Sequence, residues 1–155
     1  MSALDMFEIG KRVEIGSHTF TADAIVAYAQ KYDPQPFHVD EEAARNSMFG
    51  GLCASGWHTT AVWMKKNLEY GEMRDAELKA QGKTPPVMGP SPGLSNLKWL
   101  RPVYANDTIR FFNTVTSARQ RQNNPEWGIV ELFSEGYNQN GDKVVEFDNA
   151  VLVRM

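Results

Sequence analysis

An aspartate and a histidine five positions apart are the residues of this chain best suited to proton transfer. Asp33 and His38 lie in segment 33–40, which reads Asp-Pro-Gln-Pro-Phe-His-Val-Asp. Pro34 and Pro36 fix their own φ angles and favour extended conformations at the preceding residues, so the loop should hold the pair in a set relation. Histidine titrates near neutrality and aspartate supplies a fixed negative charge, which suits acid–base catalysis. Because aspartate and proline are also common in turns, a structural turn or cap fits the same residues.

Length and composition indicate a soluble globular protein. The chain has 155 residues, of which 42% are hydrophobic and 23% charged, and its net charge is −3. This length fits a single domain over residues 1–155 with a core of its own. Scattered basic residues and a slight negative charge argue against a nucleic-acid partner, which would require a basic face. No apolar segment approaches the roughly 20 residues that span a bilayer, so no membrane partner is expected.

The cysteine content indicates a reducing compartment. Cys53 is the one cysteine of the chain, which excludes disulfides and cysteine-based zinc sites within a single chain. The first ten residues lack the basic region and the apolar core of a signal peptide. A cytoplasmic location is the simplest prediction from these two observations.

The elements that must position the pair follow from capping and hydrophobic periodicity. A strand is predicted over 12–20, followed by a helix that Thr21 caps and that ends near Asp33, because a proline comes next. A short helix is predicted within 39–48, with Asp40 as its N-cap. The pair should therefore lie between two helices.

The clearest helix is predicted over 55–69. Its apolar side chains recur with spacings of four, three and four at Trp57, Ala61, Met64 and Leu68. This spacing predicts one buried face. Ser55 is a natural N-cap and Gly56 falls in the first turn. Segment 71–92 mixes charges with prolines and glycines, and we expect an irregular excursion, either a binding-site lid or a surface loop with no such role.

The C-terminal part of the chain changes to the alternating pattern of β-strands. Strands are predicted over 94–101, 108–116, 127–137 and 144–153. Asn140-Gly141 predicts a tight hairpin between the last two strands, and the last three should form an antiparallel meander. A sheet wrapped on one helix is an α+β architecture.

Three motifs, in order along the chain, resemble those of the MaoC-like dehydratases, the (R)-specific enoyl-CoA hydratases. Residues 32–40 resemble the family's Gly-Asp-x-Asn-Pro-x-His-x-Asp signature. Residues 50–57, Gly-Gly-Leu-Cys-Ala-Ser-Gly-Trp, fall where the family enters its central helix, usually through a His-Gly-Met step. Residues 98–103 and 106–108 resemble its strand and its Pro-Val-x-x-Gly-Asp-Thr turn. The resemblance extends from about residue 10 to the C-terminus.

Four residues depart from the family pattern. Tyr32 replaces a glycine, Gln35 an asparagine, Ser55 a frequent histidine and Asn106 a glycine. The acid and base groups stay in place, but the acyl group of the substrate is left open.

The resemblance implies a single hotdog domain, an antiparallel sheet wrapped around a long central helix at about 55–69. It also implies that a helix-and-loop insertion over 21–48 carries Asp33 and His38. Hotdog domains of this family pair through their sheets, so a homodimer or a higher homo-oligomer is expected.

The activity that the resemblance implies is that of a lyase in acyl-CoA and fatty acid metabolism. The expected reaction is reversible hydration of a trans-2-enoyl-CoA, or a related enoyl thioester, to the (R)-3-hydroxyacyl-CoA. No cofactor is expected beyond the coenzyme A thioester substrate. Asp33 would be the main base, and His38 would orient or share the proton of one water. Backbone N–H groups near Gly56 would stabilise the thioester oxyanion, with Ser55 and Trp57 as neighbouring substrate-binding residues.

Other interpretations stay open. The chain could be an acyl-CoA thioesterase on the same fold, or a non-catalytic module that binds acyl thioesters. Gly56 could be a packing glycine, and Ser55, for which capping is favoured, could instead bond the catalytic loop. His38 and Asp40 have a spacing that metal ligands can have, but no second cluster completes such a site, so no metal is expected.

Overall fold

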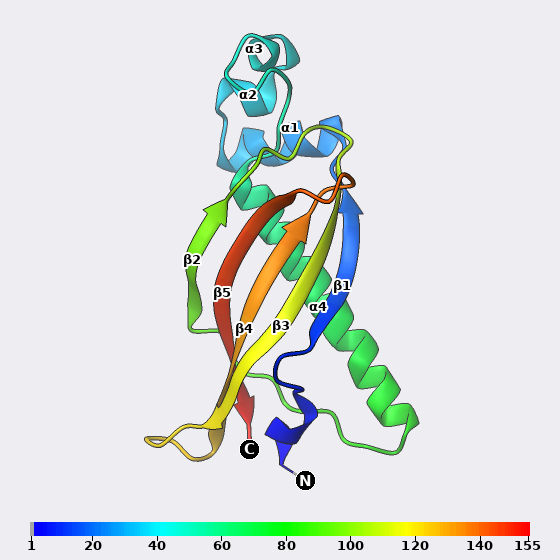
Figure 1. Ribbon diagram of the computed structural model, residues 1–155, viewed down its shortest axis with the longest axis vertical. Coiled ribbons are helices and arrows are strands. Elements are labelled where there is room, and N and C mark those ends of the chain that lie inside the picture. The colour runs from blue at the N-terminus through cyan, green and yellow to red at the C-terminus, as the bar shows by residue number, and fades with distance from the viewer. Residues whose placement is uncertain (1) are drawn as a thin grey trace.

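The computed structural model describes residues 2–155, which form a curved five-stranded sheet packed on one long helix (Figure 1). In chain order the elements are η1 (Ala3–Met6), β1 (Arg12–Thr19), α1 (Ala22–Tyr32), α2 (Pro36–Val39), α3 (Glu41–Arg45), α4 (Gly56–Ala80), β2 (Gly93–Trp99), β3 (Thr108–Gln120), β4 (Trp127–Tyr137) and β5 (Lys143–Arg154). The strand order is β1-β3-β4-β5-β2, and all neighbours are antiparallel. The predicted α+β architecture and the C-terminal meander are confirmed.

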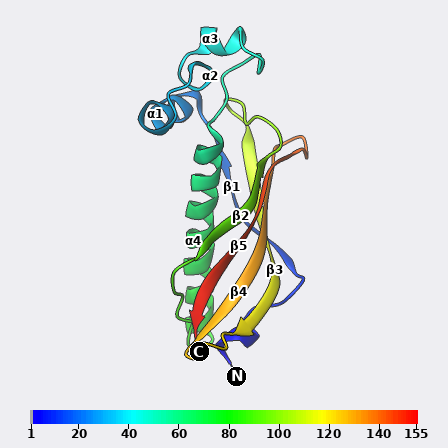
Figure 2. The same cartoon turned by 90° about the vertical axis from the view of Figure 1, so that its left-hand side faces the viewer.

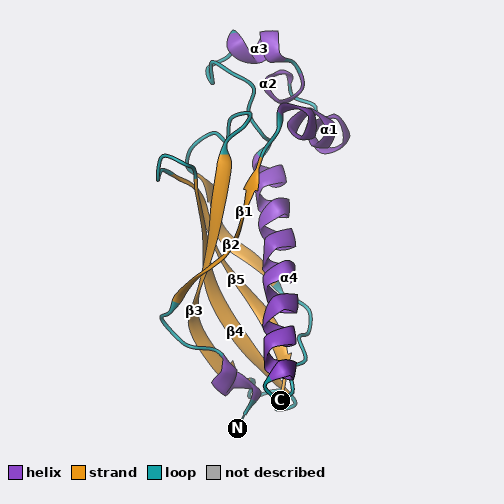
Figure 3. Ribbon diagram, turned by 90° about the vertical axis from the view of Figure 1, so that its right-hand side faces the viewer, coloured by secondary structure: helices purple, strands orange, loops and turns teal. Residues whose placement is uncertain are grey.

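The helices are divided between a face of the sheet and one of its ends. Helix α4 runs along one face of the sheet (Figure 2), and α1, α2 and α3 gather beyond the end of the sheet at which α4 begins (Figure 3). Both chain termini lie at the opposite end (Figure 1). The insertion that carries Asp33 and His38 therefore sits over the N-terminus of α4. Within residues 2–155, none of the helices is both long and apolar enough to cross a membrane.

Helix α4 is longer than the sequence pattern predicted. It continues from Gly56 to Ala80 instead of ending near 69, so the irregular excursion is limited to 81–92. Residues 71–80 are rich in Glu, Lys, Arg and Ala, which favour helix, and Arg74 pairs with Glu77 at 2.7 Å. After the last helical residue, Ala80, the chain reverses at Gly82, whose φ is +73°, and the Lys83 N–H donates to the carbonyl of Leu78 at 2.9 Å. This is a Schellman ending, which glycine favours.

The predicted buried face of α4 is wrong. Its residues Trp57, Met64 and Leu68 are 54%, 42% and 60% exposed. Five other residues of the helix are buried instead, namely His58, Thr59, Thr60, Val62 and Trp63. Trp63 meets the ring of Phe147 edge to face at 4.7 Å. Periodicity located a real apolar stripe, but the stripe faces away from the sheet.

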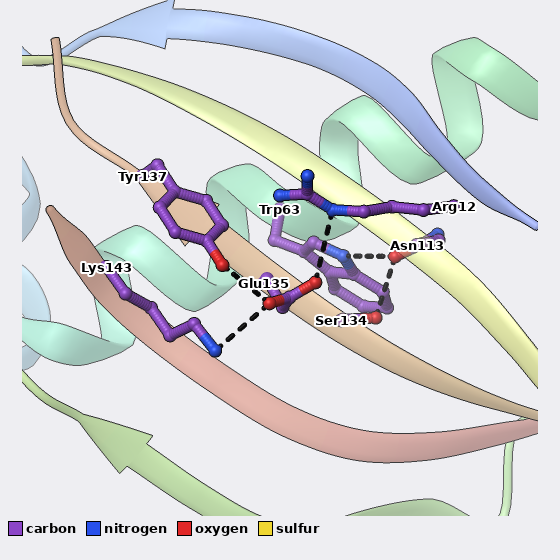
Figure 4. Close-up of polar contacts among 7 residues, drawn as sticks. All are labelled: Arg12, Trp63, Asn113, Ser134, Glu135, Tyr137 and Lys143. Carbon is purple, nitrogen blue, oxygen red and sulfur yellow. Dashed lines mark hydrogen bonds and ion pairs between the residues drawn. The ribbon is translucent and has the colours of Figure 1, made fainter. Parts of the chain in front are cut away.

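A buried polar network fixes α4 against β3 and β4 (Figure 4). The indole Nε1 of Trp63 donates to Oδ1 of Asn113 at 3.0 Å, and Ser134 Oγ donates to the same oxygen at 2.7 Å. Asn113 Nδ2 donates to Asn67 Oδ1 at 2.8 Å, again on α4. A satisfied buried network of this kind specifies one packing arrangement, because each bond would be costly to leave unmade. On the opposite face of the sheet, three side chains contact Glu135: Arg12, Tyr137 and Lys143.

Candidate active site

Asp33 is positioned by the end of α1. Thr21 Oγ1 accepts a hydrogen bond from the Ala24 N–H at 3.2 Å, which confirms the predicted cap at the start of this helix. At the other end, the Asp33 N–H still donates to Ala29 at 2.8 Å, but its φ of −156° and ψ of 68° leave the helical region. The proline that follows disfavours a helical conformation at Asp33. The Asp33 carboxylate therefore lies at the C-terminus of α1, where the backbone leaves the helical conformation.

His38 is held from a second direction. It lies on α2, whose first residue is Pro36, and it is 6% exposed. Its Nδ1 atom lies 2.5 Å from the carbonyl oxygen of Cys53, in the segment that leads into α4. A carbonyl can only accept, so Nδ1 carries the proton and donates it. In the neutral imidazole, Nε2 is then the unprotonated nitrogen, available as a base.

The structure brings Asp33 and His38 together as predicted. The Nε2 atom of His38 lies 3.4 Å from Oδ2 of Asp33. With Nδ1 donating to the Cys53 carbonyl, Nε2 of the neutral imidazole and the Asp33 carboxylate both act as acceptors toward the space between them. Two acceptors at this separation can each accept one hydrogen of the same water, which leaves the lone pairs of its oxygen free to attack a substrate.

The environment of Asp33 favours its charged form. Burial alone would raise its pKa, but the hydrogen-bonding influence of Ser55 and Gln35 and the electrostatic influence of the nearby His38 ring outweigh burial, and the pKa of Asp33 is lowered. Gln35 Nε2 donates to Oδ1 of Asp33 at 2.7 Å. The carboxylate is therefore ionised near neutral pH, the state that a general base needs.

Ser55 stands beside the pair without serving as a side-chain cap. It occupies the N-cap position of α4, but its hydroxyl makes no capping hydrogen bond, so the favoured capping prediction is wrong. Ser55 is fully buried, and its Oγ has no hydrogen-bond partner of good geometry among residues 2–155. The hydroxyl is nevertheless close enough to Asp33 to help lower its pKa. The other interpretation of Ser55, an interaction of its hydroxyl with the loop that carries Asp33, fits this placement better than capping does.

The N-terminus of α4 lies under a tryptophan from β2. The first N–H groups of a helix have no intrahelical acceptor, so those of Gly56 and Trp57 are available to a ligand. The indole of Trp99 covers Gly56 so closely that a Cβ there would lie 2.2 Å from Trp99 Cδ2. Trp57 meets Trp99 edge to face at 4.9 Å, and Trp99 Nε1 donates to Thr60 Oγ1 at 3.2 Å. Gly56 is thus a packing glycine, and this role is compatible with an available N–H.

Two further residues near the pair were not assigned a part by sequence reasoning. Cys53 supplies the carbonyl that orients His38, and because backbone carbonyls carry no residue signature, no sequence signal could have found it. Burial and the charge of Asp33 raise the pKa of the Cys53 thiol to about 11, so it is protonated and not a nucleophile. Trp99 was placed only in a strand, and its contact with Gly56 depends on the tertiary fold.

Asp40 has a structural task of its own. Its Oδ1 accepts from the Ala43 N–H at 2.8 Å, which confirms it as the N-cap of α3. The residues of the chain that the structure describes contain no group of three His, Cys, Asp or Glu side chains arranged to hold a metal ion. The carboxylate of Asp40 is therefore explained by helix capping.

The sequence from residue 6 to residue 131 matches the model of the MaoC-like domain family. The chain belongs to this family. The crystal structure of a MaoC-like dehydratase from Rhodospirillum rubrum is similar to it, with 34% identity, a TM-score of 0.76, and coverage of 97% of this chain and 95% of the other. An uncharacterized protein of Bacillus subtilis, YdeM, is 30% identical over 97% of this chain and 98% of its own length.

The hotdog fold predicted from the motifs is confirmed by these structural neighbours. A further one is the unliganded R-hydratase PhaJ1 from Pseudomonas aeruginosa, with a TM-score of 0.69 and 19% identity, covering 97% of this chain and 84% of the other. At this identity the likeness establishes the fold alone. This chain and that R-hydratase therefore share the hotdog fold.

Proposed function

We propose that this protein catalyses the reversible hydration of a trans-2-enoyl-CoA, or of a closely related enoyl thioester, to the (R)-3-hydroxyacyl thioester. One observation carries the proposal. A carboxylate held ionised and the Nε2 atom of His38 face each other at 3.4 Å, and the bond from Nδ1 to the Cys53 carbonyl makes Nε2 the accepting nitrogen of the neutral imidazole. Such a pair is suited to binding and deprotonating one water.

In the proposed reaction, Asp33 Oδ2 and His38 Nε2 each accept one hydrogen of the same water. As the water oxygen attacks C3 of the enoyl group, Asp33 takes one of these protons, and His38 orients the water or shares the proton. The proton is then delivered to C2 from the same face, which completes a syn addition. No net proton is gained or lost by the enzyme.

The charge that develops on the thioester oxygen needs donors of its own. The N–H groups of Gly56 and Trp57 point out of the N-terminus of α4, where the helix dipole also favours negative charge. Donors of this kind typically change rates by about 100- to 1,000-fold. Ser55, immediately before them, places a hydroxyl next to Asp33, so the water site and the oxyanion site would adjoin.

The family supports the same reaction class. The relative from Rhodospirillum rubrum is described as a MaoC-like dehydratase and is similar over almost the whole chain. Dehydration is the reverse of the proposed hydration and uses the same groups. In this chain Asp33 lies at the end of α1 and His38 on α2, beside the N-terminus of the central helix.

We also propose that the protein acts as a homodimer. The outward stripe of α4, with Trp57, Met64 and Leu68 exposed, adjoins β2, an edge strand on which Leu94 and Trp99 are 43% and 44% exposed. Exposed apolar patches beside an unpaired strand edge favour association. A second copy of the chain, paired along β2 and α4, would cover both features and would lie next to Gly56 and Trp57.

Activity on a panel of enoyl-CoA thioesters that differ in length, branching and charge tests the reaction. Loss of enoyl absorbance measures hydration, and a thiol reagent measures release of free coenzyme A. We expect the first signal without the second. Thiol release without hydration would instead indicate a thioesterase, and binding without either signal, seen as a raised melting temperature, would indicate a non-catalytic acyl-binding module.

A further inference from the structure

Gln35 connects the two residues of the candidate pair. Its side-chain Nε2 donates to Oδ1 of Asp33 at 2.7 Å. Its backbone N–H donates to the Asp33 carbonyl at 2.8 Å, and its own carbonyl accepts from the backbone N–H of His38 at 2.9 Å. A single residue is therefore bonded to both members of the pair, to Asp33 through backbone and side chain and to His38 through the backbone.

The chemistry of the two groups sets the direction of the side-chain bond. An ionised carboxylate can only accept hydrogen bonds, so the amide must present its NH₂ group and not its oxygen. The bond occupies Oδ1 and leaves Oδ2 facing His38 Nε2 at 3.4 Å. Rotation of the carboxylate would exchange the two oxygens and would have to break this charge-assisted bond.

The backbone conformation of the loop positions the side-chain amide of Gln35 beside Asp33. Gln35 is extended, with φ −76° and ψ 145°, a conformation that the following Pro36 favours, and Pro34 likewise restricts Asp33. An exposed glutamine would ordinarily sample many rotamers. Here both the side-chain amide and the backbone N–H of Gln35 donate to Asp33, so the amide and the carboxylate are pre-organised together.

We propose that Gln35 is a positioning residue that locks the Asp33 carboxylate so that Oδ2, and not Oδ1, meets the water shared with His38. The inference rests on the proposed hydration for its effect on rate, but not for its effect on the carboxylate. The amide also stabilises the charged form of Asp33, together with Ser55 and His38 and against the effect of burial. Gln35 thus fixes the orientation of the Asp33 carboxylate and also favours its ionised form.

Two measurements on Gln35→Leu test this role, one of them independent of activity. The side-chain carboxyl ¹³C resonance of Asp33, assigned by its absence in Asp33→Asn, is titrated by NMR, and kcat and KM for crotonyl-CoA hydration are followed against pH. We expect the Asp33 pKa to rise, since one charge-assisted bond to the carboxylate is lost. We expect kcat to fall about 10- to 100-fold with little change in KM, as for a misaligned catalytic group. Gln35→Asn, which keeps the amide on a shorter stem, should recover part of both effects.

Gln30→Leu, a substitution of the same type at an exposed position on α1, is the matched control and should change neither quantity. An unchanged Asp33 titration in Gln35→Leu would overturn the proposal, even if activity fell, because the loss would then come from a general disturbance of the loop. A shifted titration with unchanged kcat would also overturn it. If the wild-type protein hydrates no enoyl thioester, the proposed function fails, whereas the NMR titration still decides whether Gln35 holds the carboxylate.

Discussion

The indole ring of Trp99 fills the space above Gly56 that any larger residue would need. A Cβ at residue 56 would lie 2.2 Å from Cδ2 of Trp99 and 2.3 Å from its Cε2, both on the rigid ring. The contact joins the edge strand β2 to the first turn of α4. It therefore links the architecture of the sheet to the N–H groups proposed to bind the thioester.

Gly56→Ala should destabilise the protein by about 1 to 3 kcal/mol, the usual cost of overpacking, because Trp99 must move. Gly71→Ala is the matched control, since it lies in the same helix with nothing within 4 Å of the added Cβ. That change should stabilise by about 0.5 to 1 kcal/mol through helix propensity. Denaturant unfolding measures both values. If Gly56→Ala changed the free energy of unfolding in the same way as Gly71→Ala, the contact with Trp99 would not be the cause of the destabilisation. The same would follow if Trp99→Ala, added to Gly56→Ala, failed to recover stability.

Ser55→Ala should separate a catalytic-loop role from a capping role. The hydroxyl has no partner of good geometry, so its loss should change the free energy of unfolding by less than about 0.5 kcal/mol. The pKa of Asp33 should rise because one stabilising influence is lost, and the acid limb of the kcat/KM profile should move to higher pH. Thr21→Ala, which removes a true cap, should cost about 1 kcal/mol and leave the acid limb unchanged. The reverse pattern would identify Ser55 as the cap.

The acid stability of the fold should depend on His58. This residue is 7% exposed, stacks on Tyr28 at 4.6 Å, and has an unpaired Nδ1 among the described residues. Burial, with a smaller effect of His18, lowers its pKa to about 4. Because the folded pKa lies below the unfolded value of about 6.5, the unfolded state binds the proton more readily. Stability is complete above pH 6.5 and declines as the pH falls toward 4, by up to about 3 kcal/mol.

Unfolding experiments between pH 4 and pH 7 on the wild type and on His58→Phe measure this contribution. Phenylalanine keeps an aromatic ring against Tyr28 but cannot be protonated. The variant should show a shallower loss of stability over this window, while losses due to carboxyl groups at lower pH stay common to both proteins. If the free energy of unfolding fell with pH at the same slope in both proteins, protonation of His58 would not be the cause of the loss.

The outward stripe of α4 should be an interface between two copies. Met64→Glu places a charge in the middle of this stripe and should convert a dimer to a monomer, as measured by light scattering during gel filtration. Met48→Glu makes the same change at a residue that is 92% exposed on the insertion, and should leave the dimer intact. A wild-type protein that is monomeric at micromolar concentration would contradict the proposed association.

The sequence predicted those parts of the fold that depend on local signals. Thr21 and Asp40 cap their helices as expected, and the Asn140-Gly141 turn joins β4 and β5, with Gly141 at a φ of +81°. Asn106, a departure from the family's glycine, has a φ of +71°. Asparagine tolerates this left-handed conformation better than most residues, so the departure preserves the turn.

What the sequence could not supply depends on contacts between distant segments. The apolar period of Trp57, Met64 and Leu68 is real, but a period does not say whether the sheet or another molecule covers it. Trp63 and Asn113 are 50 positions apart, and nothing local marks them as partners. The proximity of Asp33 and His38 was predictable because both lie in one short loop, whereas the Cys53 carbonyl that orients the histidine comes from elsewhere in the chain.

The most direct test of the proposed chemistry is hydration of crotonyl-CoA by the wild type and by Asp33→Asn. The substitution keeps the size of the side chain and removes the charge that faces His38 at 3.4 Å. We expect at least a 1,000-fold loss of kcat, consistent with the scale of about 100- to 10,000-fold for general acid–base catalysis, with a cooperative thermal transition retained. Full hydration activity in a folded Asp33→Asn protein would contradict the assignment of Asp33 as the base.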